Sequence, residues 1–473
     1  MMQRGKTQGT ERQRPFGLRD KVGYLFGDFG NDFTFILSSS FLLKFYTDVM
    51  GVPAGIVGMI MMIARFVDAV TDVTMGRICD RSPVTANGKF RPWIRRMCGP
   101  VAIASFLLYQ SSLANQPLTF KVIYLFITYL LWGSIFYTSI NIPYGSMASA
   151  ISADPSDRQS LSTFRTMGAQ LAGVVIGAGV PLFAYDSVDG KQILNGGRMT
   201  LIAGIFSVCA VCCYLLCYRL TTERVHPEVD EKTKEENSVG RMLKNAFTNR
   251  ALLSIIAASI VMLLAQLTMQ SMANYVYPNF YRNTAAQSAT TMAMMGVMLV
   301  AAAIAKPLSE KFGKAEVSVV SNLFAGLVCI ALLVIRPANV WVYVAMQGLC
   351  WFGLGIFSMV SWALITDVID YSELRNGIRE DGTVYALYSF ARKLGQAASA
   401  GLSGALLTAI GYTQATAFDA GVVNSIFTIS NLIPAIGFLA LAAILWFWYP
   451  LHKKQVDANV AALKTKHEKE TNE

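Results

Sequence analysis

The feature that most constrains this chain is its series of long apolar blocks, each of about twenty residues or more and separated by short polar segments. A helix needs about 20 consecutive apolar residues to cross the hydrocarbon core of a bilayer, whereas a soluble amphipathic helix carries only an apolar stripe. Only 15% of the residues are charged, against about 25% in a typical soluble protein. The pattern predicts an all-α polytopic membrane protein.

The apolar blocks predict twelve transmembrane helices in two groups of six. The first group covers residues 22–47, 53–77, 97–114, 120–150, 160–184 and 197–219, and the second covers 250–277, 287–308, 315–336, 338–366, 382–411 and 422–450. The polar segment between the groups has the composition of a solvated linker. The expected organisation is an N-terminal six-helix half at 1–220, a cytoplasmic middle loop at 221–249, a C-terminal six-helix half at 250–450 and a cytoplasmic tail at 451–473.

The net charge of +10 is unevenly placed along the chain. Lys and Arg concentrate before the first predicted helix and in the loops after even-numbered helices, as with Arg91, Arg95 and Arg96 after the second. Because cytoplasmic loops of membrane proteins carry an excess of Lys and Arg, both termini are expected on the cytoplasmic side. A basic excess alone would also fit a nucleic-acid partner, but this distribution argues against one.

Residues that would indicate catalysis or a structural metal are scarce. The three histidines, His226, His452 and His467, fall in loops or in the tail, and no nucleophile constellation or cofactor loop accompanies them. The eight cysteines lie in apolar blocks or beside basic loops, which favours packing over a disulfide framework or a zinc site. The sequence therefore argues against an enzyme.

Three charged residues lie within the second predicted helix. Arg65, Asp68 and Asp72 are spaced i, i+3 and i+7, which places them on one face. Each charge at the bilayer centre costs roughly 2.5–3.5 kcal/mol, so they require partners. Two carboxylates one turn apart could bind a monovalent cation. The alternative is a structural ion-pair network in which Arg65 neutralises one carboxylate.

Four motifs follow one another along the chain. They are Asp80-Arg81 with Gly88-Lys89-Phe90-Arg91-Pro92-Trp93, Asn141-Ile142-Pro143-Tyr144-Gly145-Ser146, Asp367-Val368-Ile369-Asp370-Tyr371 and Phe390-Ala391-Arg392-Lys393-Leu394-Gly395-Gln396. In these motifs the chain resembles the glycoside–pentoside–hexuronide cation symporters, including the melibiose permease and glucuronide carrier branches. The resemblance implies the major facilitator fold, with two six-helix halves and a substrate site near the midplane between them.

The resemblance also implies the transport reaction and its cation site. Family members couple uptake of a sugar or glycoside, including glucuronides and pentosides, to sodium, a proton or lithium. The positions of Asp68 and Asp72 bind the cation in the melibiose permease branch, and Thr71 and Thr138 match positions that supply oxygen ligands there. Asp68 and Asp72 would thus hold sodium if the protein is sodium-coupled, and no further cofactor is expected.

The residues that the resemblance and their polarity mark for sugar binding are Asp32, Asn141, Tyr137, Arg165, Lys393 and Ser389. For Lys393 the alternative is that it neutralises the Asp68/Asp72 cluster. A carboxylate such as Asp32 suits this task because it accepts charge-assisted hydrogen bonds from two adjacent hydroxyls. Asn141 and Gly145 depart from the melibiose permease branch, so the sugar's identity is left open. Asp28 is expected instead to pair with a basic residue such as Lys21 or Arg19.

A second charged set lies at the cytoplasmic end of the tenth predicted helix. Asp367 and Asp370 are expected to face basic residues that include Arg158 and Arg379, and pairs that cross between the halves would close an inner gate. A static loop cap is the alternative.

The predicted setting is a multi-pass monomer in a bacterial inner membrane, with a small-molecule sugar, a cation and lipid as partners. A proton-coupled exporter and a sugar uniporter of the same fold are the competing functions.

Overall fold

The computed structural model describes residues 14–225 except 86, residues 249–376 and residues 381–472. Residues 14–225 are called here the first half and residues 249–472 the second half. The first half contains α1 (Leu18–Asp48), α2 (Ala54–Arg81), α3 (Arg91–Leu107), η1 (Ser111–Leu113), α4 (Leu118–Leu130), η2 (Leu131–Tyr137), α5 (Thr138–Ile151), α6 (Pro155–Phe183) and α7 (Gly196–Leu220). The π-helical turn η2 joins α4 and α5 into one continuous segment.

The second half contains α9 (Arg250–Tyr275), η3 (Val276–Phe280), α10 (Thr284–Phe312), α11 (Lys314–Ile335), α12 (Val340–Asn376), α13 (Asp381–Ala409), α14 (Ala420–Ala443), η4 (Ile444–Trp448) and α15 (Lys453–Asn472). Each half thus provides six long helical segments, and α15 occupies the predicted tail. Within the described residues, nine segments are long and apolar enough to cross a membrane. The other three are α1 and α13, which carry charged residues within their length, and α3, which has only 17 residues.

Most helix ends agree with the predicted spans to within a few residues. Two spans are clearly wrong. The tenth, predicted at 338–366, ends ten residues too early, because α12 continues to Asn376. The third, predicted at 97–114, is displaced, because α3 runs from Arg91 to Leu107. Its arginines were assigned to a loop, yet they lie in the first two turns of the helix, which begins at a proline that suits a helix start. The predicted middle loop, 221–249, lies largely outside the described residues.

A β-hairpin between α6 and α7 was not predicted. Strands β1 (Tyr185–Val188) and β2 (Lys191–Leu194) pair antiparallel, with Tyr185 opposite Leu194. The two turn residues, Asp189 and Gly190, both have positive φ, 50° and 71°. Asp-Gly is a preferred pair for such a turn, so the signal was present in the sequence.

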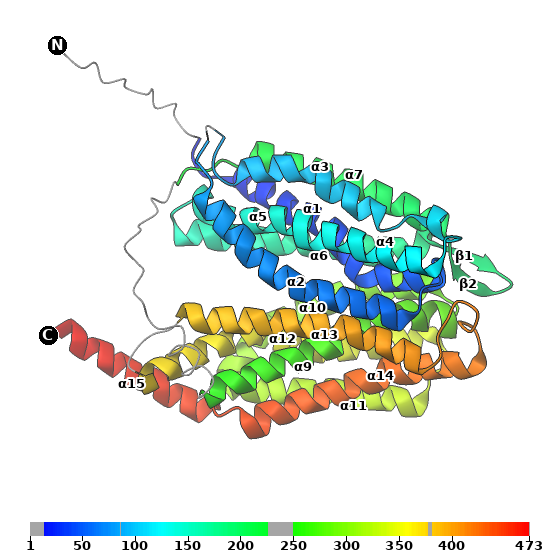
Figure 1. Ribbon diagram of the computed structural model, residues 1–473. Coiled ribbons are helices and arrows are strands. Elements are labelled where there is room, and N and C mark those ends of the chain that lie inside the picture. The colour runs from blue at the N-terminus through cyan, green and yellow to red at the C-terminus, as the bar shows by residue number, and fades with distance from the viewer. Residues whose placement is uncertain (1–13, 86, 226–248, 377–380, 473) are drawn as a thin grey trace, which may run out of the picture.

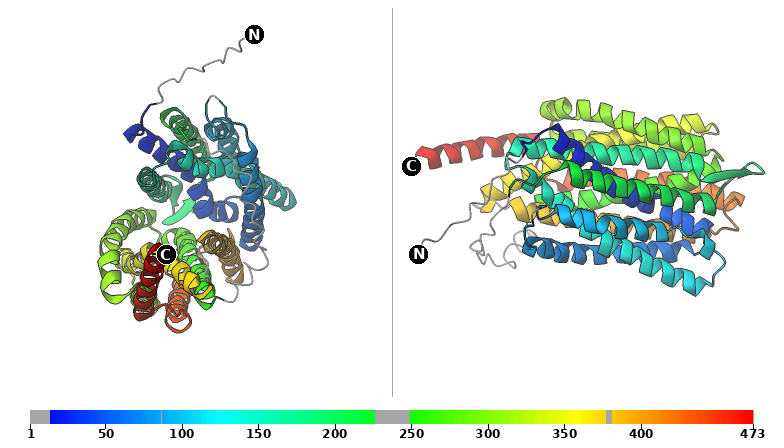
Figure 2. Two further views of the ribbon diagram at one scale, coloured as in Figure 1. Left: turned by 90° about the vertical axis from the view of Figure 1, so that its left-hand side faces the viewer. Right: turned by 90° about the horizontal axis from the view of Figure 1, so that it is seen from above.

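The two halves form two helical bundles that lie side by side (Figures 1 and 2). They meet where α2 packs against α13 and where α6 packs against α10. The first helix of each half, α1 and α9, also make contact. In Figure 1 the start of α1 and the end of α15 lie at one end of the molecule and the β-hairpin at the other. These are called here the terminal end and the hairpin end.

Polar contacts between the halves close the hairpin end. Lys44 of α1 is buried, forms an ion pair with Asp48 at 2.7 Å and donates to Asn279 Oδ1 and to the hydroxyl of Tyr412 in the second half. The ammonium also lies 4.3 Å from the ring centroid of Tyr275. Four residues from both halves thus surround one buried cation, and this Lys44 cluster was not anticipated from the sequence.

The packing of α2 on α13 depends on glycine. A Cβ at Gly58 would lie 2.8 Å from the carbonyl oxygen of Ala400 on α13, whereas a Cβ at Gly76 on the same helix would meet nothing within 4 Å. Small residues allow membrane helices to approach closely. Gly58→Ala is therefore expected to lower the melting temperature of the purified protein, since overpacking costs about 1–3 kcal/mol.

Gly76→Ala is the matched control, because it brings the same gain in helix propensity, about 1 kcal/mol, without the clash. We expect it to leave the melting temperature unchanged or to raise it. Equal shifts in the two variants would contradict this account of the helix contact.

Candidate functional site

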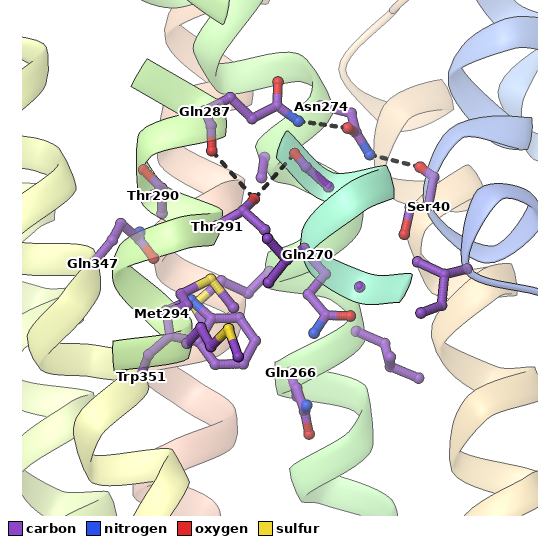
Figure 3. Close-up of a pocket in the computed structure, with 18 of the residues that line it drawn as sticks. Ser40, Gln266, Gln270, Asn274, Gln287, Thr290, Thr291, Met294, Gln347 and Trp351 are labelled. Carbon is purple, nitrogen blue, oxygen red and sulfur yellow. Dashed lines mark hydrogen bonds between the residues drawn. The ribbon is translucent and has the colours of Figure 1, made fainter. Parts of the chain in front are cut away.

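A cavity of about 350 Å³ lies between the two halves (Figure 3). Its walls come from α1 and α6 of the first half and from α9, α10 and α12 of the second. Toward the hairpin end it is bounded by contacts between the halves, in which Asn274 donates to the carbonyl of Ser40 and Thr291 to the carbonyl of Gly177. The cavity therefore lies where a transporter of two halves would hold its substrate.

Amide side chains from α9 line this cavity. Gln266, Gln270 and Asn274 are spaced i, i+4 and i+8, so they form one stripe on the helix (Figure 3). Asn274 is held at one end of the stripe, since it also accepts from Gln287 at 2.7 Å. The sequence analysis missed this stripe, although its spacing within an apolar block was a usable signal.

The two carboxylates of α2 each have a hydroxyl and a cationic partner. Asp68 accepts from Ser134 Oγ at 2.5 Å and lies 3.6 Å from the guanidinium of Arg65. Asp72 accepts from Thr138 Oγ1 at 2.9 Å and forms an ion pair with Lys393. The predicted residues Asp68, Asp72, Thr138 and Lys393 therefore lie together, and Ser134 is an addition to the predicted set.

Two partners in this cluster come from different elements. Ser134 and Thr138 lie in and just after the π-helical turn η2, which packs against α2. Lys393 comes from α13, so its ion pair with Asp72 joins the two halves. Thr71 donates to the backbone carbonyls of Val67 and Asp68 instead of facing another helix. Among the described residues, no hydrogen bond therefore joins the Thr71 hydroxyl to the side chain of Asp68 or Asp72, and its role as a cation ligand stays a prediction.

Arg65 connects the carboxylate cluster with the cavity. Its guanidinium lies 4.8 Å from the ring centroid of Phe35, and it lines a smaller cavity of about 80 Å³. The two cavities share Phe35, Ser39, Leu267 and Gln270 as wall residues. The network with Arg65, which was the alternative to cation binding, is thus present, and the second carboxylate has Lys393 as its own partner.

The predicted sugar residues of the first half gather on the terminal side of the large cavity. Asp28 pairs with Arg165 at 3.1 Å, so its expected pairing with a basic residue is confirmed, although the partner is neither Lys21 nor Arg19. Asp32 lies one turn further along α1 and makes no hydrogen bond or ion pair with other described residues. Phe35 and Ile36, the next residues on its face, line the cavity.

Asn141 and Tyr137 also lie near α1. Asn141 accepts from Asn31 at 3.3 Å, and Asn31 in turn accepts from the hydroxyl of Tyr214 on α7. The ring of Tyr137 stacks on Phe35 with centroids 5.5 Å apart. Tyr137 thus lies next to the wall residue Phe35, and Asn141 is fixed in a chain of three polar side chains with Asn31 and Tyr214.

On α13, Ser389 is exposed and precedes Lys393 by one turn. Trp351 of α12 lines the large cavity, whereas Trp132 is buried beside Tyr129 and Tyr137. Trp351 is therefore the tryptophan best placed to contact a substrate.

Two of the predicted gate residues, Arg158 and Asp367, make contacts within their own halves. Arg158 donates to the carbonyls of Ser152 and Ala153, and Asp367 pairs with Lys314 of α11 at 2.6 Å. Arg379 lies outside the described residues, and Asp370 follows Asp367 by one turn on α12. The pair of Arg158 with Asp367 is thus not formed in this conformation, and Lys314 is a partner that the sequence analysis missed.

Comparisons with known proteins agree with the fold. A family model described as MFS/sugar transport protein matches residues 23–453. The uncharacterized symporter YjmB of Bacillus subtilis is 31% identical, over 95% of this chain and 96% of that protein. The glucuronide carrier protein homolog of Escherichia coli is 28% identical, over 92% and 93%.

A solved structure supports the fold alone. It is a bacterial homolog of the human lysosomal transporter Spinster in an inward-facing and unoccupied conformation. It matches with a TM-score of 0.62 at 10% identity, over 92% of this chain and 98% of that chain.

Proposed function

Since this chain belongs to the MFS/sugar transport protein family, we propose that it is a symporter that takes up a sugar or glycoside together with sodium or a proton. It is a multi-pass membrane transporter and not an enzyme. The observation that carries the proposal is the ion pair between Asp72 on α2 and Lys393 on α13, because it links an intramembrane carboxylate to the contact between the halves.

Coupling would arise from competition at the α2 carboxylates. Asp68 and Asp72, with the hydroxyls of Ser134 and Thr138, present oxygen atoms of the kind that bind a hard cation. A cation or proton at Asp72 would weaken its attraction for Lys393 and free the halves to move.

Such competition makes sugar and cation binding interdependent. If the cation raises sugar affinity, the sugar must raise cation affinity by the same factor. One charge crossing 100 mV gains about 2.3 kcal/mol, and a tenfold cation gradient adds about 1.4 kcal/mol. Their sum would sustain roughly 500-fold sugar accumulation at one-to-one coupling.

The orientation that we propose follows from the basic loops. The terminal end would face the cytoplasm, with both termini inside, because the loops at that end carry the excess of Lys and Arg. The hairpin end would then lie on the outer side of the membrane. Because the Lys44 cluster closes that end, the conformation would be inward-facing. In that conformation the terminal end would be open, which would explain why Arg158 and Asp367 bind partners in their own halves and not each other.

The test of this function is uptake of labelled methyl glycosides and glucuronides by membrane vesicles, with sodium, lithium or pH gradients imposed separately. We expect one cation gradient to drive accumulation above the external concentration. Equilibration without accumulation would indicate a uniporter, and proton-driven efflux would indicate an exporter of the same fold.

Asp32 provides a more specific prediction for the sugar site. Asp32→Asn is expected to weaken sugar binding by roughly ten- to one-hundred-fold, since a hydrogen bond to a charged group contributes about 1.5–3 kcal/mol. Titration of the purified protein with the transported glycoside measures this change. An affinity equal to that of the wild type would show that Asp32 does not contact the sugar.

A further inference from the structure

The large cavity has a distinctive chemistry, because its walls combine many amides with no charged side chain among the described lining residues. The amides are Gln170, Gln266, Gln270, Asn274, Gln287 and Gln347. Hydroxyl groups, including those of Thr290 and Thr291, complete the polar surface. An uncharged amide both donates and accepts hydrogen bonds, as a sugar hydroxyl does.

Part of this polar surface is unused within the protein. Gln266 and Gln270 are half-buried and make no hydrogen bond with other described residues, and both lie toward the cavity in Figure 3. Gln287 is 6% exposed, and its Oε1 is buried without a hydrogen-bond partner. Buried polar groups normally have partners, so these amides offer sites for a ligand's hydroxyls.

The cationic side chains near the cavity are already paired. Arg65 lies beside Asp68, Lys393 pairs with Asp72, and Arg165 pairs with Asp28. On the terminal side, Asp32 adds a carboxylate one turn from the cavity wall. A carboxylate or sulfonate on the substrate would therefore meet no cationic side chain among the described lining residues and would lie near the negative charge of Asp32, at a high desolvation cost.

We infer that the cavity selects an uncharged, polyhydroxylated sugar or glycoside, held by the amides of α9 and α10, and excludes uronates and other anionic sugars. This inference rests on the proposed function, since it names the substrate class of the same transporter. The amides fix the hydroxyls, and Trp351 provides an apolar surface for the C–H face of the ring.

The test is direct binding to the purified full-length protein, which requires no ion gradient. Calorimetric titration would compare methyl glucoside, methyl galactoside and methyl xyloside with the methyl glycosides of glucuronate and galacturonate at neutral pH. We expect at least one neutral glycoside to bind ten or more times more tightly than its uronate counterpart. Equal or tighter uronate binding, or binding of neither class, would overturn the inference.

Variants of the α9 stripe test the residues. Gln266→Leu and Gln270→Leu should each weaken binding of the neutral glycoside about tenfold, a loss of about 1.4 kcal/mol. Gln159→Leu, which removes an exposed amide near the start of α6 and outside both cavities, is the matched control and should retain wild-type affinity. Unchanged affinity in both glutamine variants, with wild-type melting temperatures, would exclude the amides as sugar ligands.

The outcomes separate this inference from the proposed symport. If neutral glycosides bind but no cation drives their accumulation, the coupling is wrong and the substrate class stands. If a cation gradient instead drives accumulation of a uronate that binds more tightly, the symport stands and the substrate class is wrong.

Discussion

Replacing Asp72 by asparagine is expected to abolish cation-driven sugar accumulation. The asparagine side chain can still accept a hydrogen bond from Thr138, but the substitution removes the negative charge that pairs with Lys393 of the other half. Accumulation in vesicles should fall from as much as roughly 500-fold to about the external concentration. Exchange of labelled for unlabelled sugar should persist, because the cavity wall contains neither residue.

Two further variants distinguish coupling from a purely structural ion pair. Asp189→Asn changes an exposed carboxylate in the hairpin turn to a residue that tolerates the same positive φ, and it should accumulate sugar normally. Asp72→Asn combined with Lys393→Met removes both charges. If Asp72→Asn alone lowers the melting temperature, the double variant should restore it, but it should not restore sugar accumulation. Recovery of accumulation in that double variant would mean that the pair only holds the halves together.

Replacing Lys44 by methionine is expected to open the hairpin end. Lys44 and Asp48 are 1% and 14% exposed, and Lys44 also donates to Asn279 and Tyr412 of the second half. Removing one partner of a buried ion pair costs about 3–5 kcal/mol, which here would destabilise the conformation closed at this end. The population should therefore shift toward the opposite conformation.

Thiol labelling measures this shift. In a background without the native cysteines, Ser39→Cys places one thiol in the cavity wall, shielded by the closed hairpin end. Lys44→Met should raise its labelling rate by an impermeant reagent, added from the hairpin side, by tenfold or more. Lys191→Met, at an exposed lysine of the same end, is the control. Equal rates in both variants would show that the Lys44 cluster does not hold this end closed.

The helices and the charged cluster could be predicted because exposing long apolar segments to water, or leaving charged side chains unpaired in the membrane, costs a large free energy. Apolar blocks leave few alternatives to transmembrane helices, and three charges on one face of α2 demanded partners. The partners themselves were harder to assign. Lys393 was expected either to neutralise the Asp68/Asp72 cluster or to bind sugar, and the first expectation agrees with its ion pair with Asp72. The pair of Asp28 with Arg165 was not predicted, because it depends on how distant helices pack.

Other features were missed because they leave weaker signals. The glutamines of α9 are uncharged, so an isolated one in an apolar block attracts little notice, and only the i, i+4, i+8 spacing distinguishes the stripe. Lys44 lies near a helix end, where a lysine normally extends to the membrane surface. Its burial follows from contacts with Asn279 and Tyr412, which are more than two hundred residues away in the chain.

The most direct test of the central claim, that sugar and cation binding are linked, is a pair of titrations of the purified protein. Sugar affinity is measured with and without saturating cation, and cation affinity with and without saturating sugar, for sodium, lithium and protons in turn. We predict that one cation raises sugar affinity and that the sugar raises that cation's affinity by the same factor. Sugar affinity that is identical with and without each of the three cations would contradict the account.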